Sequence, residues 1–180
     1  DGEPASAETG RPYLERHIHG GIYAARPDIQ AVVHNHAAAV IPFSLAGVAL
    51  RPAIHVAAVV GAEVPVWDIR DSFGDTDMLV RNVDHGRDLA AALGAHTAIL
   101  MRGHGATIAG QTLEHAVTAS LYLMINARIV QEAAALSAGG LDALTFLTEA
   151  EIEQSRTTQL GDVTLGRVWD YLVSRAGIDF

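Results

Sequence analysis

The sequence carries two histidines spaced two residues apart in an apolar segment. His34 and His36 lie within residues 31–36, which are rich in β-branched side chains. In a β-strand, residues i and i+2 project to the same face, with Cα atoms about 7 Å apart. Both imidazoles could therefore reach one metal ion. On its own, a His-x-His pair is weak evidence for a metal site, because such pairs more often belong to an ordinary strand.

A third histidine follows another apolar segment. His104 stands between Gly103 and Gly105, just after residues 97–101, which have the composition of a strand. A histidine flanked by glycines is often only a turn residue. If this segment ends beside the first one, His104 supplies a third nitrogen. Three protein ligands leave the fourth position of a tetrahedral metal for water or substrate, as catalytic sites require.

Composition narrows the class of protein. The 180-residue chain holds 21 acidic and 12 basic residues, a net charge of −9, and no basic run, which argues against a nucleic-acid partner. Cysteine is absent, so imidazole and carboxylate groups must hold any metal, and these suit Zn, Mn, Fe, Co or Ni. No apolar segment has the length of a membrane span and no signal peptide opens the chain, so we expect a cytoplasmic protein.

Hydrophobic periodicity predicts short strands interleaved with helices, which is typical of an α/β fold. Strands are expected at residues 30–34, 97–101 and 106–109, the last two as a hairpin-like pair, and strand or buried segments at residues 55–60 and 64–68. Helices are expected at residues 13–26, 38–47, 84–94, 113–136 and 162–175, with another opened by a capping box at residues 148–151.

These elements indicate one domain over residues 1–180, in which residues 141–180 form a C-terminal helical tail. The turn-rich residues 1–6 resemble the interior of a domain more than its start. We therefore expect that the N-terminal part of the domain is missing from this sequence.

Several segments occur together in a characteristic order. They are Glu15, residues 22–28, residues 31–36, residues 52–55, Val64-Pro65, Phe73-Gly74 and His104-Gly105, followed by a long helix. This arrangement, over residues 10–136, resembles the class II aldolase/adducin family, whose type members are L-fuculose-phosphate aldolase and ribulose-5-phosphate 4-epimerase.

The resemblance implies a three-layer α/β/α sandwich with a mostly antiparallel central sheet, assembled as a homotetramer with active sites at subunit interfaces. It implies one divalent metal ion per subunit, Zn or Mn with Fe or Co as further options, held by His34, His36 and His104. It assigns the acid/base to Glu15, which can also approach the metal. Adducin-like members of the family lack these ligands and are structural proteins, so the complete set here argues against that class.

Two kinds of lyase remain open. The charged residues 70–78, Arg102 shortly before His104, and residues 169–172 are closer to a decarboxylase branch of the family. That branch acts on hydroxylated aromatic dicarboxylates such as 3-hydroxy-2-methylpyridine-4,5-dicarboxylate or 3,4-dihydroxyphthalate. The alternative is an aldolase that cleaves a sugar phosphate, and the loop that would grip the phosphate is expected upstream of Asp1. We favour the decarboxylase.

Either reaction breaks a carbon–carbon bond and leaves an electron pair that needs a sink. A divalent metal at a carbonyl or phenolic oxygen would act as a Lewis acid, with Glu15 as the proton carrier. His19, four residues after Glu15, is expected to share its helix face and to hydrogen-bond it. A small anionic substrate with two carboxylates needs a cationic clamp, for which Arg102, Arg70 and Arg16 are candidates. Each of these arginines also fits an ordinary ion pair.

The remaining histidines are expected to lie outside the chemistry. His17 and His55 are interpreted as packing or supporting residues, and His85, His96 and His115 as solvated surface residues.

Overall fold

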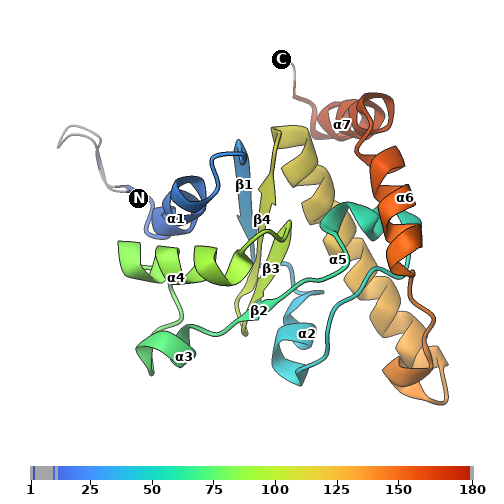
Figure 1. Cartoon of the computed structure of the whole chain (residues 1–180), viewed down its shortest axis with the longest axis horizontal. Helices are drawn as coiled ribbons and strands as arrows, with labels where there is room; N and C mark the ends of the chain where they lie inside the picture. The colour runs from blue at the N-terminus through green and yellow to red at the C-terminus, as the bar shows by residue number, and fades with distance from the viewer. Residues whose placement is uncertain (1, 3–9, 11, 179–180) are drawn as a thin grey trace.

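A four-stranded sheet lies between two layers of helices in the part of the chain that the computed structural model describes, residues 2, 10 and 12–178 (Figure 1). The strands stand in the order β1-β4-β3-β2, with β4 antiparallel to both neighbours and β2 parallel to β3. The expected mostly antiparallel sheet is therefore confirmed. The strands are β1 (Ala31–Asn35), β2 (Val66–Trp67), β3 (Ala98–Met101) and β4 (Gly105–Gly110).

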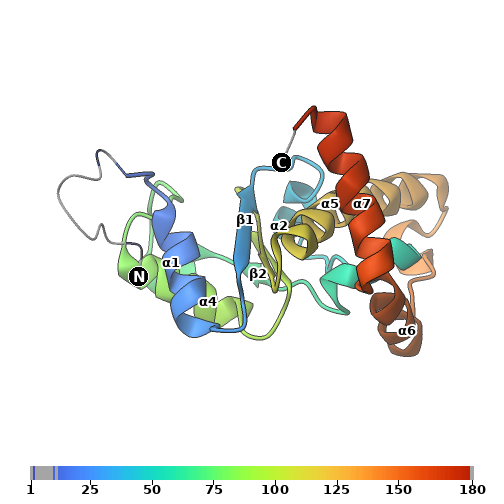
Figure 2. The same ribbon diagram turned by 90° about the horizontal axis from the view of Figure 1, so that it is seen from above.

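Helices cover both faces of the sheet, which completes the expected three-layer arrangement (Figures 1 and 2). One layer holds α1, α3 and α4; the other holds α2, η2 and α5, with α6 packed on η2 and α7 on α5. None of the helices in the described ranges combines the length and the apolar character that crossing a bilayer requires. They are α1 (Arg16–Ala25), α2 (Ile41–Ala46), the 3₁₀ helix η2 (His55–Val60), α3 (Ile69–Phe73), α4 (Val83–Leu93), α5 (Leu113–Leu136), the 3₁₀ helix η3 (Gly140–Ala143), α6 (Glu149–Gln159) and α7 (Asp162–Ala176).

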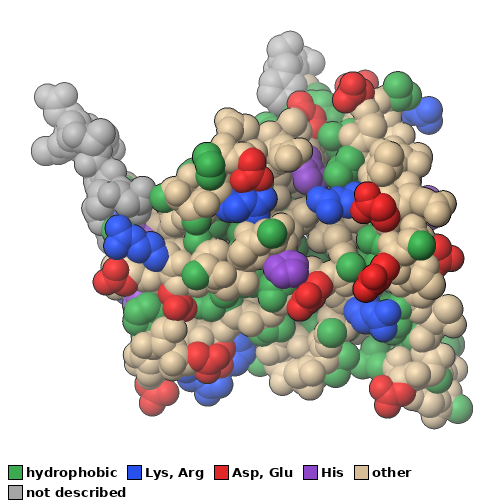
Figure 3. All heavy atoms as spheres, viewed as in Figure 1, with side chains coloured by type: hydrophobic (Ala, Val, Ile, Leu, Met, Phe, Trp, Pro, Cys, Tyr) green, Lys and Arg blue, Asp and Glu red, His purple; other side chains and the backbone are tan. Residues whose placement is uncertain are grey.

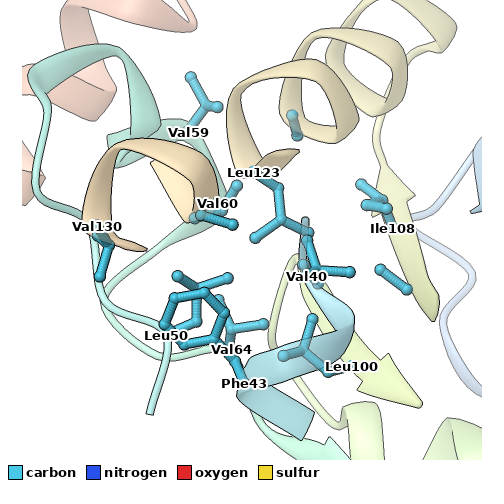
Figure 4. Packing of buried hydrophobic residues seen from close by; sticks show 14 residues of the cluster. Val40, Phe43, Leu50, Val59, Val60, Val64, Leu100, Ile108, Leu123 and Val130 are labelled. Atoms are coloured by element: carbon cyan, nitrogen blue, oxygen red, sulfur yellow. The ribbon is translucent and has the colours of Figure 1, made fainter. Parts of the chain in front are cut away.

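The central strands are buried on both sides because each face of the sheet packs against a helical layer. Ile99 and Met101 of β3 belong to the apolar cluster that includes α1 and α4. Leu100, between them in the sequence, belongs to the opposite cluster, where Phe43 of α2 and Leu123 of α5 lie (Figure 4). Successive residues of a strand point to opposite faces, so one short strand serves both cores.

Most of the expected elements are confirmed, including the pairing of β3 with β4. The capping box of α6 makes both hydrogen bonds: the Glu151 N–H donates to Thr148 Oγ1 at 3.2 Å, and the Thr148 N–H donates to Glu151 Oε2 at 2.8 Å. Residues 55–60 are largely buried, but they form η2 and not a strand. The N–H groups of Ala57 and Gly61 bond to carbonyls three residues earlier, so local bonds replace those of a partner strand.

Two further sequence expectations concern the ends of the chain. The turn expected over residues 1–6 lies, apart from Gly2, outside the described residues. Within the expected C-terminal tail of residues 141–180, the 3₁₀ turn η3 and the helices α6 and α7 follow the long helix α5.

The helices α1 and α4 cross in close contact because a glycine of one faces a glycine of the other. A Cβ atom placed on Gly21 would lie 2.3 Å from the carbonyl oxygen of Gly86, and one placed on Gly86 would lie 2.1 Å from the carbonyl oxygen of His17. Neither position has room for a side chain. The crossing matters for the site because Glu15 is the residue that immediately precedes α1.

Replacing Gly86 by alanine should therefore force α1 and α4 apart. We expect Gly86→Ala to lower the free energy of unfolding by about 1–3 kcal/mol, the usual cost of an overpacked contact. Denaturant unfolding of wild type and variant measures the difference. The matched control is Gly166→Ala in α7, where a Cβ atom meets no neighbour within 4 Å. That change should leave stability unchanged or raise it slightly, because alanine favours a helix. Equal effects at both positions would contradict the close crossing.

Candidate metal centre

Three histidines meet where β1 ends beside the turn between β3 and β4. His34 lies on β1, His36 directly follows it, and His104 lies in the turn. The Nε2 atom of His36 is 3.1 Å from Nε2 of His34 and 2.9 Å from Nε2 of His104. Glu15 joins them, with its Oε2 atom 3.6 Å and 3.7 Å from Nε2 of His34 and His104. The four candidate ligand atoms all lie within 4.8 Å of one another.

Two glycines make this approach possible. Gly103 has a φ angle of +62°, which glycine adopts without steric cost, and it turns the chain tightly after β3. Gly105 touches the end of β1: a Cβ atom at this position would lie 2.1 Å from the carbonyl oxygen of Asn35. The glycines on either side of His104 therefore bring that histidine next to His36.

The Nδ1 atoms of two histidines contact backbone carbonyl groups. His34 Nδ1 is 3.1 Å from the carbonyl oxygen of Ala106 and 3.2 Å from the Thr107 hydroxyl. His104 Nδ1 is 3.1 Å from the carbonyl oxygen of Met78. A carbonyl only accepts hydrogen bonds, so each Nδ1 must carry the hydrogen and donate it. This tautomer leaves the lone pair of Nε2 facing the centre of the cluster, as in metal-binding histidines.

Burial keeps two of these imidazoles neutral. It lowers the pKa of His34 from 6.5 to about 4, although the negative charge of Glu15 acts in the opposite direction. Burial likewise lowers the pKa of His104. Both rings are therefore uncharged at neutral pH, which is the form in which histidine binds a metal ion.

The carboxylate of Glu15 is buried and held in one orientation. Only 4% of the residue is exposed. Its Oε1 atom accepts a hydrogen bond from the backbone N–H of Val80 at 3.1 Å. Its other oxygen, Oε2, faces the histidines and accepts a hydrogen bond from the Tyr13 hydroxyl at 3.4 Å. One oxygen is thus fixed by the backbone and the other is directed at the cluster.

This set of donors fits a divalent metal ion. Nitrogen ligands bound at about 2.0–2.1 Å in a tetrahedral site lie about 3.4 Å from one another. The Nε2 atom of His36 lies slightly closer than this to the other two Nε2 atoms, at 3.1 and 2.9 Å. His36 is exposed, so solvent or a substrate can reach the cluster from its side. Imidazole and carboxylate donors suit Zn, Mn, Fe and Co, and the arrangement does not single out one of them.

The candidate arginines are engaged elsewhere in the structure. Arg102 forms an ion pair with Asp68, with 2.6 Å between Nε and Oδ2, and Arg70 pairs with the same carboxylate at 2.7 Å. These partners, Arg70 first, hold the pKa of Asp68 well below its usual range. Arg16 donates to the carbonyl oxygen of Gly2 at 2.6 Å. Basic and acidic side chains are interspersed on the face shown in Figure 3, without a continuous basic patch.

His19 does not join the cluster of the other four residues. The expected shared face requires both residues to lie within one helix. Glu15 instead precedes α1, with φ −90° and ψ 23°, so the helical spacing of i and i+4 does not apply. His19 is half-buried, and burial lowers its pKa.

The other histidines agree only in part with the sequence interpretation. His17 is buried, as a packing residue should be, whereas the expectation that His115 is solvated is wrong, since only 6% of it is exposed. Its pKa is lowered by burial and by the positive charge of Arg156. The sequence reasoning also missed Met78 and Val80, which contact the cluster through backbone atoms. No residue-type signal marks such contacts.

Comparison with known proteins identifies the family. Residues 1–130 match the class II aldolase and adducin N-terminal domain, and the chain belongs to this family. It is 33% identical over 196 residues to the decarboxylase tropJ of Talaromyces stipitatus, covering 99% of this chain and 74% of that protein. It is 32% identical over 147 residues to the 3,4-dihydroxyphthalate decarboxylase of Terrabacter sp., covering 79% of this chain and 58% of that protein.

Solved structures agree on the fold. An aldolase II superfamily protein from Pseudomonas syringae matches with a TM-score of 0.69 at 24% identity, over 97% of this chain and 68% of that one. An L-fuculose 1-phosphate aldolase from Glaciozyma antarctica matches with a TM-score of 0.65 at 20% identity, over 99% of this chain and 68% of that one. Decarboxylases and aldolases are both lyases, so the expectation of an enzyme of this class is confirmed.

The cluster predicts that metal content depends on His34. We expect His34→Ala to lose tightly bound metal, measured by elemental analysis after gel filtration, because the remaining ligands no longer surround the ion. Circular dichroism should show that the fold is retained. His96→Ala is the matched control, since His96 is a half-buried histidine outside the cluster and its loss should leave metal content unchanged. Wild-type metal levels in His34→Ala would contradict the site.

Proposed function

We propose that the protein is a metal-dependent carbon–carbon lyase that decarboxylates a hydroxylated aromatic dicarboxylate, such as a dihydroxyphthalate or a hydroxypyridine dicarboxylate. The observation that carries the proposal is the placement of Glu15. Its buried carboxylate faces three imidazoles that can hold a metal ion. The names of the two relatives, a decarboxylase and a 3,4-dihydroxyphthalate decarboxylase, support this reaction over the others that the family performs.

The chemistry follows from the positions of the side chains. When bound by His34, His36 and His104, a divalent cation would supply a Lewis acid to a phenolic or carbonyl oxygen of the substrate. Glu15 Oε2, less than 4 Å from two of these ligands, would transfer a proton to or from the neighbouring ring carbon. The Val80 N–H holds the other oxygen in place, so the carboxylate needs little reorientation during proton transfer.

The metal is proposed to be Zn or Mn, with Fe or Co as further options, and one ion per subunit. Arg102 remains the proposed partner of a substrate carboxylate. Its pairing with Asp68 means that a substrate would have to share this guanidinium group. His19 is kept as a proposed contributor only through substrate contact, because it lies outside the metal cluster.

An aldolase that cleaves a sugar phosphate is the second candidate. The family name and the fold shared with an L-fuculose 1-phosphate aldolase favour it. A phosphate would need a group of cationic or N–H donors, and in the described part of the chain several arginines are already paired with carboxylates. An adducin-like structural protein ranks last, because such a protein has no need for the complete set of ligands.

The two reactions can be separated by their products. Metal-loaded protein is incubated with 3,4-dihydroxyphthalate and hydroxypyridine dicarboxylates while release of carbon dioxide is measured. L-Fuculose 1-phosphate and related sugar phosphates are tested in parallel for release of an aldehyde. We expect carbon dioxide from at least one aromatic substrate, and turnover of the sugar phosphates alone would favour the aldolase.

Glu15→Gln tests the proton carrier. The amide oxygen can still accept the hydrogen bond from Val80, but the side chain can no longer exchange a proton. The rate should fall about 10²–10⁴-fold while bound metal is retained. Glu63→Gln, at an exposed position, is the matched control and should keep full activity. Activity of Glu15→Gln near that of wild type would contradict the assignment.

We further propose that the protein assembles as a homotetramer. An apolar cavity of about 420 Å³ opens between β1, α5 and α7, and its lining includes Val33, Leu121 and Leu172. Leu113 and Tyr171 are 50% and 62% exposed on the same two helices. Contact with another copy would bury this apolar surface. Light scattering should give four times the 19.0 kDa chain mass, whereas a monomer at micromolar concentration would reject the assembly.

A further inference from the structure

One short turn contacts two members of the metal cluster through its backbone. Residues 76–81 lie within the connection between α3 and α4. The carbonyl oxygen of Met78 accepts a hydrogen bond from His104 Nδ1 at 3.1 Å. Two residues later, the N–H of Val80 donates to Glu15 Oε1 at 3.1 Å. The orientations of the candidate ligand and of the candidate proton carrier are therefore set by the same turn.

The turn holds Met78 in a conformation that side chains disfavour. Its φ angle is +68°, and no other non-glycine residue in the described ranges has a positive φ. The left-handed region is unfavourable for an L-residue because it brings the Cβ atom too close to the backbone. Such a conformation persists only where the surroundings impose it, and unfavourable backbone conformations of this kind concentrate at functional sites.

The surroundings of Met78 do impose this conformation. The Met78 N–H donates to Thr76 Oγ1 at 2.9 Å, and the N–H of the next residue donates to Asp77 Oδ1 at 3.3 Å. Arg81 forms an ion pair with Asp77 across the turn. Val80 is fully buried in the core and anchors the end of the turn. Local hydrogen bonds and the hydrophobic core thus fix the backbone on both sides of Met78.

We propose that Met78 is a positioning residue, whose left-handed backbone directs its carbonyl group at His104 and so sets the geometry between Glu15 and the three imidazoles. The proposal rests on the metal site of the proposed function. The contribution comes from the backbone of Met78. A role for the side chain is the alternative, because the Met78 Cε atom lies over the Gly103 turn, 3.2 Å from where a Cβ of that residue would be.

Substitutions at position 78 separate the contribution of the backbone conformation from that of the side chain. Met78→Gly removes the side chain but favours a positive φ, whereas Met78→Ile places a β-branched residue where it is most strained. Alanine tolerates a positive φ less well than glycine and better than isoleucine, so Met78→Ala is an intermediate case. The matched control is Leu79→Ile, which adds the same side chain at the next residue, where φ is not positive.

The measurement is Co²⁺ binding to the metal-free proteins, followed by the visible absorption bands that report coordination geometry. We expect Met78→Gly and Leu79→Ile to bind as tightly as wild type with the same spectrum. Met78→Ile should bind about 10- to 100-fold more weakly, the usual effect of losing a group that orients a ligand. Met78→Ala should be weakened less, and it carries the test if Met78→Ile does not fold.

The outcomes distinguish failure of the proposed metal site from failure of the positioning role of Met78. A wild-type protein that takes up no Co²⁺ would refute the metal site itself. If wild type binds, equal affinity of Met78→Ile and wild type would overturn the positioning role. So would an equal loss in Met78→Gly and Met78→Ile, since this would assign the effect to the side chain. Thermal unfolding of the metal-free variants is measured in parallel, and lower stability without lower affinity would also reject the proposal.

Discussion

The antiparallel pairing of β1 with β4 is the constraint on which the candidate centre depends. In this register His34 stands opposite Thr107, and its Nδ1 atom reaches the backbone of β4 at Ala106. A shift of one residue would turn His34 to the other face of the sheet, into the apolar layer beneath α5. The pairing that builds the core therefore also selects the face on which the imidazoles meet.

One side of the candidate centre is buried and the other is exposed to solvent. Glu15 is buried behind the turn that precedes α4, whereas His36 faces solvent. Burial keeps His34 and His104 neutral, and Val80 gives the carboxylate a hydrogen bond that replaces one from water. A reacting molecule would thus enter at the exposed imidazole and meet the Glu15 carboxylate, the proposed proton carrier, on the buried side. This division suits a reaction in which a carbanion must be protonated at one defined carbon.

Sequence reasoning succeeded where the period of a secondary-structure element determines the face to which a side chain points. The two-residue period of a strand is enough to place His34 and His36 on one face, and the structure has them together. The position of His104 beside His34 and His36 could not be derived from the residues without the family resemblance, because β1 and the β3–β4 turn are far apart in the chain. The pairing of Arg102 with Asp68 was missed for a similar reason: it follows from the parallel register that places Trp67 beside Met101.

The contacts made by Met78 and Ala106 lay beyond sequence reasoning for another reason. Both residues act through carbonyl groups that every amino acid possesses, so nothing in the residue type distinguishes them. The left-handed conformation of Met78 gives no signal either, since methionine is not a residue that marks such turns. The identity of the ligands can be predicted from side chains, but what orients them becomes visible only in the folded backbone.

The long sequence separation within the cluster has a consequence for the life of the protein in a cell. Of the four candidate ligands, only His34 and His36 are neighbours in the sequence, while the third imidazole and the carboxylate are contributed by distant segments. A cation that binds only the native state shifts the folding equilibrium toward it, by about 2.7 kcal/mol at a hundred times its Kd. The free ion would therefore protect the folded chain from proteolysis as well as complete its site.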